Sequence, residues 1–198
     1  MKGIPVLGLV SLMVAVVPGQ SQAGEISRGA LLAYTCAGCH GANGNSNGPA
    51  TPSLAGASRD YFVEVMHQYQ ADERASTIMG RIARGYGDAE IQAMAEFFSR
   101  QGFEPAKSQP FDPDHVEKGA RLHHQYCEKC HGKGGASAED DAGILAGQWT
   151  PYLRYTLDDI RTGKSPSSKK MKRKLEEMHR KSGDAGIEQL LDFYASRK

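Results

Sequence analysis

The sequence predicts an all-α protein built from two tandem copies of one small helical unit. In several stretches apolar residues recur every three or four positions, which is typical of helices with one buried face. No stretch alternates apolar and polar residues as a half-buried strand does. Short landmarks recur in the same order, 91 to 96 residues further along: residues 36–41 and 127–132, 54–56 and 145–147, and 87–89 and 183–185. The pattern indicates an internal duplication, with about five extra residues late in the second copy.

The first 23 residues have the pattern of an export signal. Lys2 supplies a positive start, residues 4–17 are almost all apolar, and small residues precede a cleavage point after Ala23. An uncleaved membrane anchor is the alternative, but this stretch is broken by a proline and is shorter than the ~20 residues that span a bilayer. We therefore expect a cleaved signal peptide at residues 1–23, a periplasmic mature chain and no membrane-spanning segment.

The mature chain divides at a proline-rich stretch. Residues 104–114 contain three prolines and lack helical periodicity, which is typical of a linker. This predicts an N-terminal domain at 24–103 and a C-terminal domain at 115–198. Domains of about 80 residues seldom bury enough apolar surface unaided, so a cofactor, metal or disulfide is expected in each.

Helical periodicity places three helices in each unit. Leu31 and Leu122 are expected to face inward from the helix that opens each unit, and glycine-rich loops such as 41–48 follow it. The expected helices cover residues 26–36, 61–66 and 89–100 in the first unit and 116–127, 152–157 and 186–196 in the second.

Composition and motifs exclude several classes of function. The 198 residues include 24 Lys and Arg against 23 Asp and Glu, so the chain lacks the positive excess of a protein that binds nucleic acid through bulk charge. The charged fraction of 24% is that of a folded protein rather than a disordered one. There is no nucleophile elbow, phosphate-binding loop or dinucleotide fingerprint. We expect no catalytic residues.

The motif Cys-x-x-Cys-His occurs twice and predicts two covalently bound haem c groups. Residues three apart on a helical turn point the same way, so Cys36 and Cys39 can both reach the vinyl edge of one porphyrin, with His40 beneath the iron. Cys127, Cys130 and His131 repeat the arrangement. A shared zinc site would have to bring together pairs 91 residues apart. A thioredoxin-like redox pair would follow a strand, and none is expected.

Methionine is the expected sixth ligand of each iron. Met79 lies 39 residues after His40, and Met171 lies 40 after His131. Thioether ligation favours reduced iron, as suits an electron carrier. Met178 is the alternative in the second unit, because Met171 and Met178 both fall on one face of an amphipathic helix.

Other candidate ligands do not recur in register. Met66 has no methionine counterpart, and Met94 aligns with Leu190, which indicates a core position. Ligation of an iron by two histidines is the remaining alternative, through His67, His123, His124 or His179.

Two further features have two interpretations each. Residues 164–181 hold eight Lys and Arg against two Glu, which is typical either of a docking patch for an acidic redox partner or of a solvated helix face. Trp149, Tyr152 and Tyr155 are candidates to line the second haem pocket or are ordinary core aromatics.

Beyond the haem motifs, the chain resembles the di-haem cytochrome subunit of flavocytochrome c sulfide dehydrogenase over nearly all of its mature length. The run RASTIMGRIARGY around Met79 is similar to the segment that supplies that family's first methionine ligand. The other similar segments are residues 126–131, 144–153, 183–186 and 193–196.

The resemblance implies two tandem class I cytochrome c domains in a heterodimer with an FAD-containing subunit. That subunit oxidises sulfide, and the cytochrome passes the electrons to a soluble acceptor cytochrome. The resemblance also implies ligation by His40 with Met79 and by His131 with Met171. The alternatives are a free-standing di-haem carrier feeding a terminal oxidase, and a haem peroxidase with one iron lacking its methionine.

Overall fold

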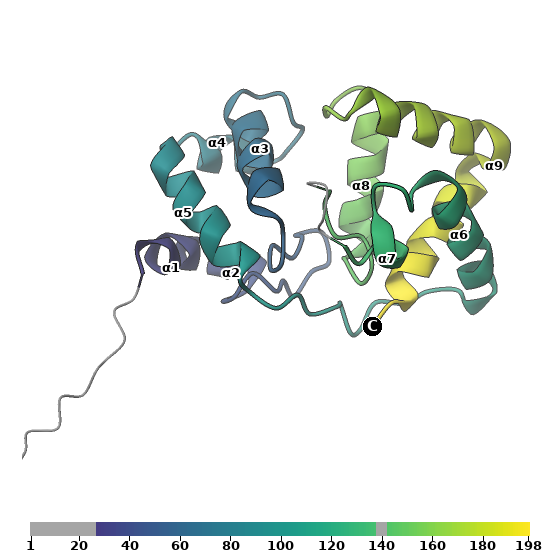
Figure 1. Cartoon of the computed structure of the whole chain (residues 1–198), viewed down its shortest axis with the longest axis horizontal. Coiled ribbons are helices and arrows are strands. Elements are labelled where there is room, and N and C mark those ends of the chain that lie inside the picture. Colours follow the sequence, from purple (N-terminus) through teal and green to yellow (C-terminus); the bar gives the residue numbers. More distant parts are fainter. Residues whose placement is uncertain (1–26, 138–141) are drawn as a thin grey trace, which may run out of the picture.

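The computed structural model describes residues 27–137 and 142–198, and these residues form helices and loops without a strand. The all-α fold predicted from the sequence is therefore confirmed. Two helical units lie side by side, and the loops that follow their cysteine motifs meet between them (Figure 1). The expected signal peptide falls outside the described residues.

The first unit contains five α-helices and one 3₁₀ turn. Ser27 and Ser58 cap the helices that follow them, because each hydroxyl accepts a hydrogen bond from a backbone N–H of the first turn. In chain order the elements are α1 (Arg28–Ala33), η1 (Tyr34–Cys36), α2 (Ala37–His40), α3 (Arg59–Gln70), α4 (Met79–Ala83) and α5 (Asp88–Ser99).

The second unit repeats this plan with a longer first helix and one long last helix. Its elements are α6 (Pro113–Tyr126), α7 (Gly132–Gly135), α8 (Thr150–Arg161) and α9 (Lys169–Ser196). α6 begins inside the expected linker, because Pro113 suits the first helical turn, where its missing N–H has no partner to lose. α9 turns sharply at Gly183, whose φ of 60° and ψ of −160° are not helical. The part of α9 after Gly183 corresponds to α5, and the extra residues of the second copy lie before it.

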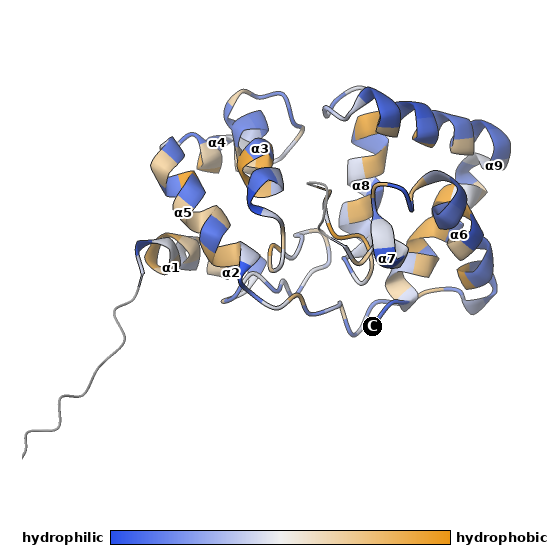
Figure 2. Ribbon diagram, viewed as in Figure 1, coloured by the Kyte–Doolittle hydropathy of each residue, from blue (hydrophilic) through white to orange (hydrophobic). Residues whose placement is uncertain are grey.

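Each unit has its own apolar core. The first core is formed by α1, α3, α4 and α5 and includes Met94, which is 0% exposed. The second is formed by α6, α8 and α9 and includes Leu190, which is 2% exposed. Apolar residues form stripes along the packed helices, with hydrophilic residues on the other faces (Figure 2). Met94 is thus confirmed as a core residue.

A glycine sets the closest approach of the first and last helices in each unit. A Cβ at Gly29 would lie 2.4 Å from the carbonyl oxygen of Ala93, and a Cβ at Gly119 would lie 2.0 Å from that of Gln189. Any side chain at either position would force the two helices apart. The two crossings are equivalent, which extends the duplication from sequence landmarks to helix packing.

The expectation that Leu31 faces inward is wrong. Leu31 is 58% exposed, and its neighbour Leu32 packs against the first core. The crossing glycine decides which face of α1 is buried, and it lies one residue nearer the motif in the first unit than in the second. The counterpart of Leu122 is therefore Leu32, and the offset of 91 residues does not hold upstream of the motif.

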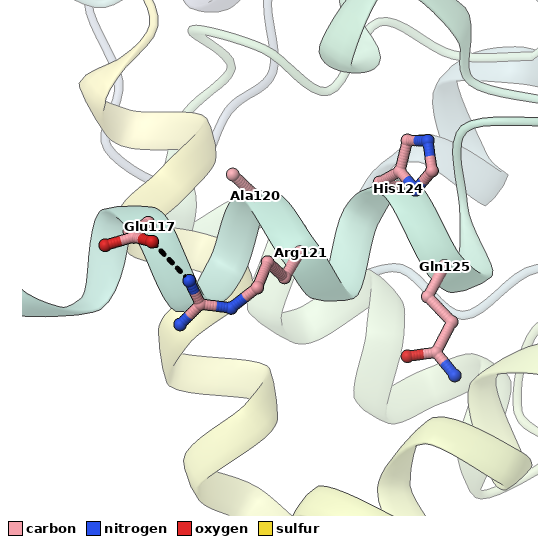
Figure 3. Close-up of a pocket in the computed structure, with 5 residues that line it drawn as sticks. All are labelled: Glu117, Ala120, Arg121, His124 and Gln125. Atoms are coloured by element: carbon pink, nitrogen blue, oxygen red, sulfur yellow. Dashed lines mark hydrogen bonds and ion pairs between the residues drawn. The ribbon is translucent and has the colours of Figure 1, made fainter.

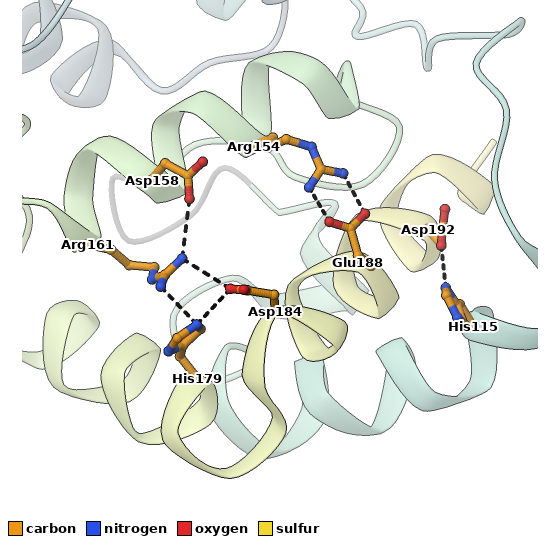
Figure 4. A network of polar contacts seen from close by, with 8 residues as sticks. All are labelled: His115, Arg154, Asp158, Arg161, His179, Asp184, Glu188 and Asp192. Atoms are coloured by element: carbon orange, nitrogen blue, oxygen red, sulfur yellow. Dashed lines mark hydrogen bonds and ion pairs between the residues drawn. The ribbon is translucent and has the colours of Figure 1, made fainter.

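Charged side chains connect the helices of the second unit (Figure 4). Arg154 of α8 forms a two-pronged ion pair with Glu188 of α9, and this pair lowers the pKa of the Glu188 carboxyl group. His115 of α6 contacts Asp192 of α9, with 2.7 Å between Nδ1 and Oδ2. These contacts fix α6 and α8 against the C-terminal half of α9.

Candidate haem sites

The first cysteine motif lies on the short helices η1 and α2. Cys36 is half-buried, Cys39 is exposed, and both thiols are free. His40 is 7% exposed, and its Nδ1 lies 2.8 Å from the carbonyl oxygen of Pro52. Because a carbonyl only accepts hydrogen bonds, the proton is on Nδ1 and the lone pair of Nε2 is free. Burial lowers the pKa of His40, which keeps the imidazole neutral.

The second motif lies between α6 and α7 and repeats this arrangement. Cys127 and Cys130 are free, and burial raises the pKa of Cys127 to about 11. Nδ1 of His131 lies 3.3 Å from the carbonyl oxygen of Gly143, and burial lowers the pKa of His131. A carbonyl twelve residues downstream therefore orients the histidine of each motif.

These groups fit covalent haem attachment. Each motif offers two unbridged thiols beside a neutral imidazole with a free Nε2, the atom that binds haem iron. Redox-active cysteines have lowered pKa values, whereas burial raises those of Cys36 and Cys127. Within the described parts of the chain, no three His, Cys, Asp or Glu side chains cluster as a metal site would require.

The loops after the motifs share one hydrogen-bond pattern. The carbonyl of Gly44 accepts from the N–H groups of Leu54 and Ala55, and the carbonyl of Gly135 accepts from those of Leu145 and Ala146. Gly44 and Gly135 both have positive φ, 81° and 88°. These bonds close the loops that carry the carbonyl partners of His40 and His131.

The candidate methionine ligands begin corresponding helices. Met79 is the first residue of α4 and packs, partly buried, against the first core. Met171 lies in the first turn of α9, where its N–H donates to Ser168, and it packs at the edge of the second core. Met178 is 1% exposed inside that core. Met178 thus packs in the second core, and the choice of Met171 as the ligand stays a prediction.

Two of the alternative histidine ligands are engaged elsewhere, His123 through both ring nitrogens and His179 through Nε2. His123 is 1% exposed, with Nδ1 2.9 Å from the hydroxyl of Tyr194 and Nε2 2.6 Å from a carboxylate oxygen of Glu128. Nε2 of His179 lies 2.9 Å from a carboxylate oxygen of Asp184 (Figure 4). A nitrogen that is hydrogen-bonded in this way has no free lone pair for iron.

His124 faces a hollow on the outer side of α6 (Figure 3). The residues that line it are Glu117, Ala120, Arg121, His124 and Gln125, all from this one helix. An ion pair joins Glu117 to Arg121 across the hollow. Apart from His124 itself, none of the candidate haem residues lines this hollow.

Trp149 and its neighbours lie at the contact between the two units. Nε1 of Trp149 donates to the carbonyl of Ser46 at 3.1 Å, and the indole ring covers Gly48 in the first unit. Tyr155, the other candidate for the haem pocket or the core, is 61% exposed. The tertiary contact thus gives Trp149 a role between the units that the sequence did not indicate.

Gln148 is a second interface residue that sequence reasoning missed. Its side-chain amide is hydrogen-bonded to both the N–H and the carbonyl of Ser53. No local pattern around Gln148 reveals this, since the two residues are 95 positions apart.

Two helical units that each place two free thiols beside a buried imidazole define a c-type cytochrome with two haem sites. Residues 26–100 match the family model described as Cytochrome c. Cytochrome c4 of Pseudomonas aeruginosa is 30% identical over 151 residues, which cover 71% of this chain and 73% of that protein. The chain belongs to the cytochrome c family, and over most of its length to the di-haem cytochromes c4. It binds haem c covalently and carries electrons.

Two further comparisons agree with the fold and with the resemblance seen in the sequence. The crystal structure of reduced recombinant cytochrome c4 from Pseudomonas stutzeri superposes with a TM-score of 0.74, covering 89% of this chain and all of that one at 23% identity. The cytochrome subunit of sulfide dehydrogenase from Chlorobaculum tepidum is 44% identical over 72 residues. That match covers 36% of this chain and 64% of the relative. The predicted resemblance to this subunit is confirmed over these 72 residues.

Proposed function

We propose that this protein is the periplasmic electron-transfer subunit of a sulfide-oxidising flavocytochrome. It accepts electrons from an FAD-containing subunit and passes them to a soluble acceptor cytochrome. The observation that carries the proposal is the 44% identity to the cytochrome subunit of sulfide dehydrogenase. No helix in the described residues is long and apolar enough to cross a membrane.

The proposal assigns the six motif residues and two methionines to two haem sites. Cys36 and Cys39 attach the first haem, whose iron is held between His40 and Met79. The second site uses the equivalent residues Cys127, Cys130, His131 and Met171. The free Nε2 of each histidine supports these assignments, as does the matched position of the two methionines at the start of α4 and α9.

Two haems suit a donor that releases electrons in pairs. Each bound haem supplies one reversible one-electron couple, so two of them together accept the two electrons of a reduced flavin. With His40 and Met79 holding the first iron and His131 and Met171 the second, neither iron would have an open position for sulfide. The chain therefore transfers electrons, and the chemistry on sulfide belongs to the flavin subunit.

An exposed basic surface supports the proposal that the acceptor docks on the second unit. None of its members forms an ion pair with another residue in the described ranges. Positive side chains are unfavourable at a helix N-terminus, where the helix dipole is itself positive, and the first turn of α9 has no acidic residue to offset them. The basic surface comprises Lys164, Lys169, Lys170, Lys172, Arg173 and Arg180.

The position of this surface fits electron exit. It surrounds Met171, the proposed ligand of the second iron, whereas the corresponding helix α4 of the first unit contains one cation, Arg81. Opposite charges accelerate the encounter of redox partners without requiring a large contact. An acidic acceptor is therefore expected at the second haem.

Co-purification and reduction kinetics test the proposal. The native protein is isolated, bound flavin is measured, and haem reduction by sulfide is followed without oxygen. We expect a flavin-containing polypeptide to remain bound and both haems to be reduced only in its presence. A cytochrome that purifies alone, and that sulfide does not reduce even with the flavoprotein added, contradicts the proposal.

The second candidate is a free-standing di-haem carrier that feeds a terminal oxidase. The match to a cytochrome c4 over 71% of the chain favours this alternative. It predicts a monomer without flavin that is oxidised rapidly by the membrane fraction. The same purification therefore distinguishes the two functions.

A further inference from the structure

A buried glutamine of the second unit is hydrogen-bonded to the loop that orients the motif histidine of the first unit. Gln148 is 4% exposed. The N–H of Ser53 donates to its Oε1 at 2.9 Å, and its Nε2 donates to the carbonyl of Ser53 at 3.0 Å. The side-chain amide thus pairs with both backbone groups of one residue across the interface.

This pairing is continuous with the hydrogen bond of His40. The N–H of Ser53 belongs to the same peptide group as the carbonyl of Pro52, which accepts from Nδ1 of His40 at 2.8 Å. An amide whose N–H is hydrogen-bonded has a more polarised carbonyl, which accepts more strongly. The three groups form one chain from the His40 imidazole through the Pro52–Ser53 peptide to Oε1 of Gln148.

Gln148 is itself held in place by its own unit. Its backbone carbonyl accepts from Nε2 of the buried Gln109 at 2.9 Å, and its Oε1 also accepts from the N–H of Trp149 at 3.1 Å. Trp149 adds its separate bond to the carbonyl of Ser46. Contacts within the second unit therefore hold Oε1 of Gln148 in position to accept from Ser53.

Among the described residues, no side-chain amide takes the place toward the loop of His131 that Gln148 takes toward the loop of His40. The position 91 residues before Gln148 is Ala57, which has no side-chain amide. The bond from His131 to the carbonyl of Gly143 is also longer, at 3.3 Å. The hydrogen-bond chain is therefore specific to His40.

We propose that Gln148 is a positioning residue that sets, across the interface, how strongly His40 donates electrons to the first iron. This inference rests on the proposed ligation of that iron by His40. A stronger hydrogen bond at Nδ1 makes Nε2 more basic, and a more basic ligand stabilises the oxidised iron. The second unit thus holds the reduction potential of the first haem below the value it would otherwise have.

The test is the variant Gln148→Met, which keeps the length of the side chain and removes its amide. The reduction equilibrium of each haem is measured by potentiometric titration. The first haem is recognised by the NMR signals that change in Met79→His. We expect the equilibrium of the first haem to shift about three- to tenfold toward the reduced form, where tenfold is ~59 mV for a one-electron couple. The second haem stays unchanged.

Trp149→Phe is the matched control, because it removes one hydrogen bond from the same interface and leaves the chain to His40 intact. It is expected to leave both equilibria unchanged. An unshifted first haem in Gln148→Met overturns the proposal. Equal shifts of both haems, or the same shift in Trp149→Phe, also overturn it, because they indicate a loosened interface.

A second variant covers the case in which Gln148→Met fails to retain both haems, as counted from the haem content per chain. Gln148→Glu presents a stronger acceptor to the N–H of Ser53, so the first haem is expected to shift toward the oxidised form. A shift toward the reduced form overturns the proposal. Failure of the proposed function has a different signature, since it is seen in the unmodified protein as a lack of reduction by the flavoprotein.

Discussion

Truncation of Met171 and of Met178 is expected to separate iron ligation from core packing. The two residues share one face of α9 but have different surroundings. Met171 lies at the edge of the second core, and Met178 lies inside it at 1% exposure. The variants Met171→Ala and Met178→Ala therefore remove different functions of the same side-chain type.

The expected magnitudes follow from burial. Removing a fully buried methionine side chain costs about 2–5 kcal/mol, because the cavity closes only in part. For a unit of about 80 residues each kcal/mol shifts the melting temperature by roughly 4–8 °C. Met178→Ala should thus lower the melting temperature of the second unit by ~10 °C or more. Met171→Ala removes the proposed ligand, so one of the two methionine–iron bonds should disappear from the absorption spectrum.

Thermal unfolding is followed by circular dichroism, and ligation by the weak charge-transfer band of the methionine–iron bond in the oxidised protein. The expected pattern is a halved band at full haem content in Met171→Ala and a full band with a lower melting temperature in Met178→Ala. The opposite pattern, with the band halved only in Met178→Ala, refutes the assignment of Met171.

Three further outcomes are expected. Gly119→Ala lowers the melting temperature of the second unit by roughly 5–15 °C, because the added Cβ would lie 2.0 Å from a carbonyl oxygen of α9. The double variant Lys172→Glu, Arg173→Glu slows electron transfer to an acidic acceptor about tenfold at low ionic strength, in a stopped-flow measurement. Arg154 holds the pKa of Glu188 below its usual value. The ion pair between Arg154 and Glu188 therefore stabilises the fold fully above the unfolded pKa of 4.5, and this stabilisation is lost as the pH falls through the lower folded pKa. The stability difference between the natural chain and Glu188→Gln, measured by denaturant unfolding, should therefore shrink as the pH drops from about 5 to about 3.

The first two of these have a control variant, and each of the three has a contradicting result. Lys118→Ala, at the exposed neighbour of Gly119, should leave the melting temperature unchanged. If Gly119→Ala has the same melting temperature as Lys118→Ala, the close crossing of α6 and α9 is contradicted. Reversal of Arg28, on the first unit, should leave the transfer rate unchanged. A rate that does not depend on salt in the natural protein removes the basis for docking by charge. A constant stability difference between pH 5 and pH 3 contradicts the role of Glu188.

The chemistry of this protein was largely predictable because it is local. The two cysteines and the histidine of each motif lie within five consecutive residues, so their spacing alone brings the thiols and the imidazole together. The duplication was visible as a constant offset between landmarks. Met94 was identified as a core residue because its partner in the other copy is an ordinary apolar residue.

The places where prediction failed involve contacts between distant segments. Leu31 was assigned to the wrong face, because the buried face of α1 is chosen by the approach of α5 at Gly29. Periodicity over six helical residues does not determine that direction. Trp149 had two interpretations, a haem-pocket residue or a core aromatic, and neither indicated that its indole ring covers Gly48, about a hundred residues earlier in the chain.

The sequence by itself therefore determined the fold class, the two haem motifs and their repetition, since these depend on residues close together in the chain. Only the tertiary structure decided which carbonyls orient His40 and His131, and that Gln148 completes the hydrogen-bond chain from the other unit. The physical reason is that the carbonyl contacts depend on how each loop folds back on its own motif, and the Gln148 contact depends on the direction in which the two units pack. That direction is set by the sum of many weak surface contacts and leaves no periodic pattern in either segment.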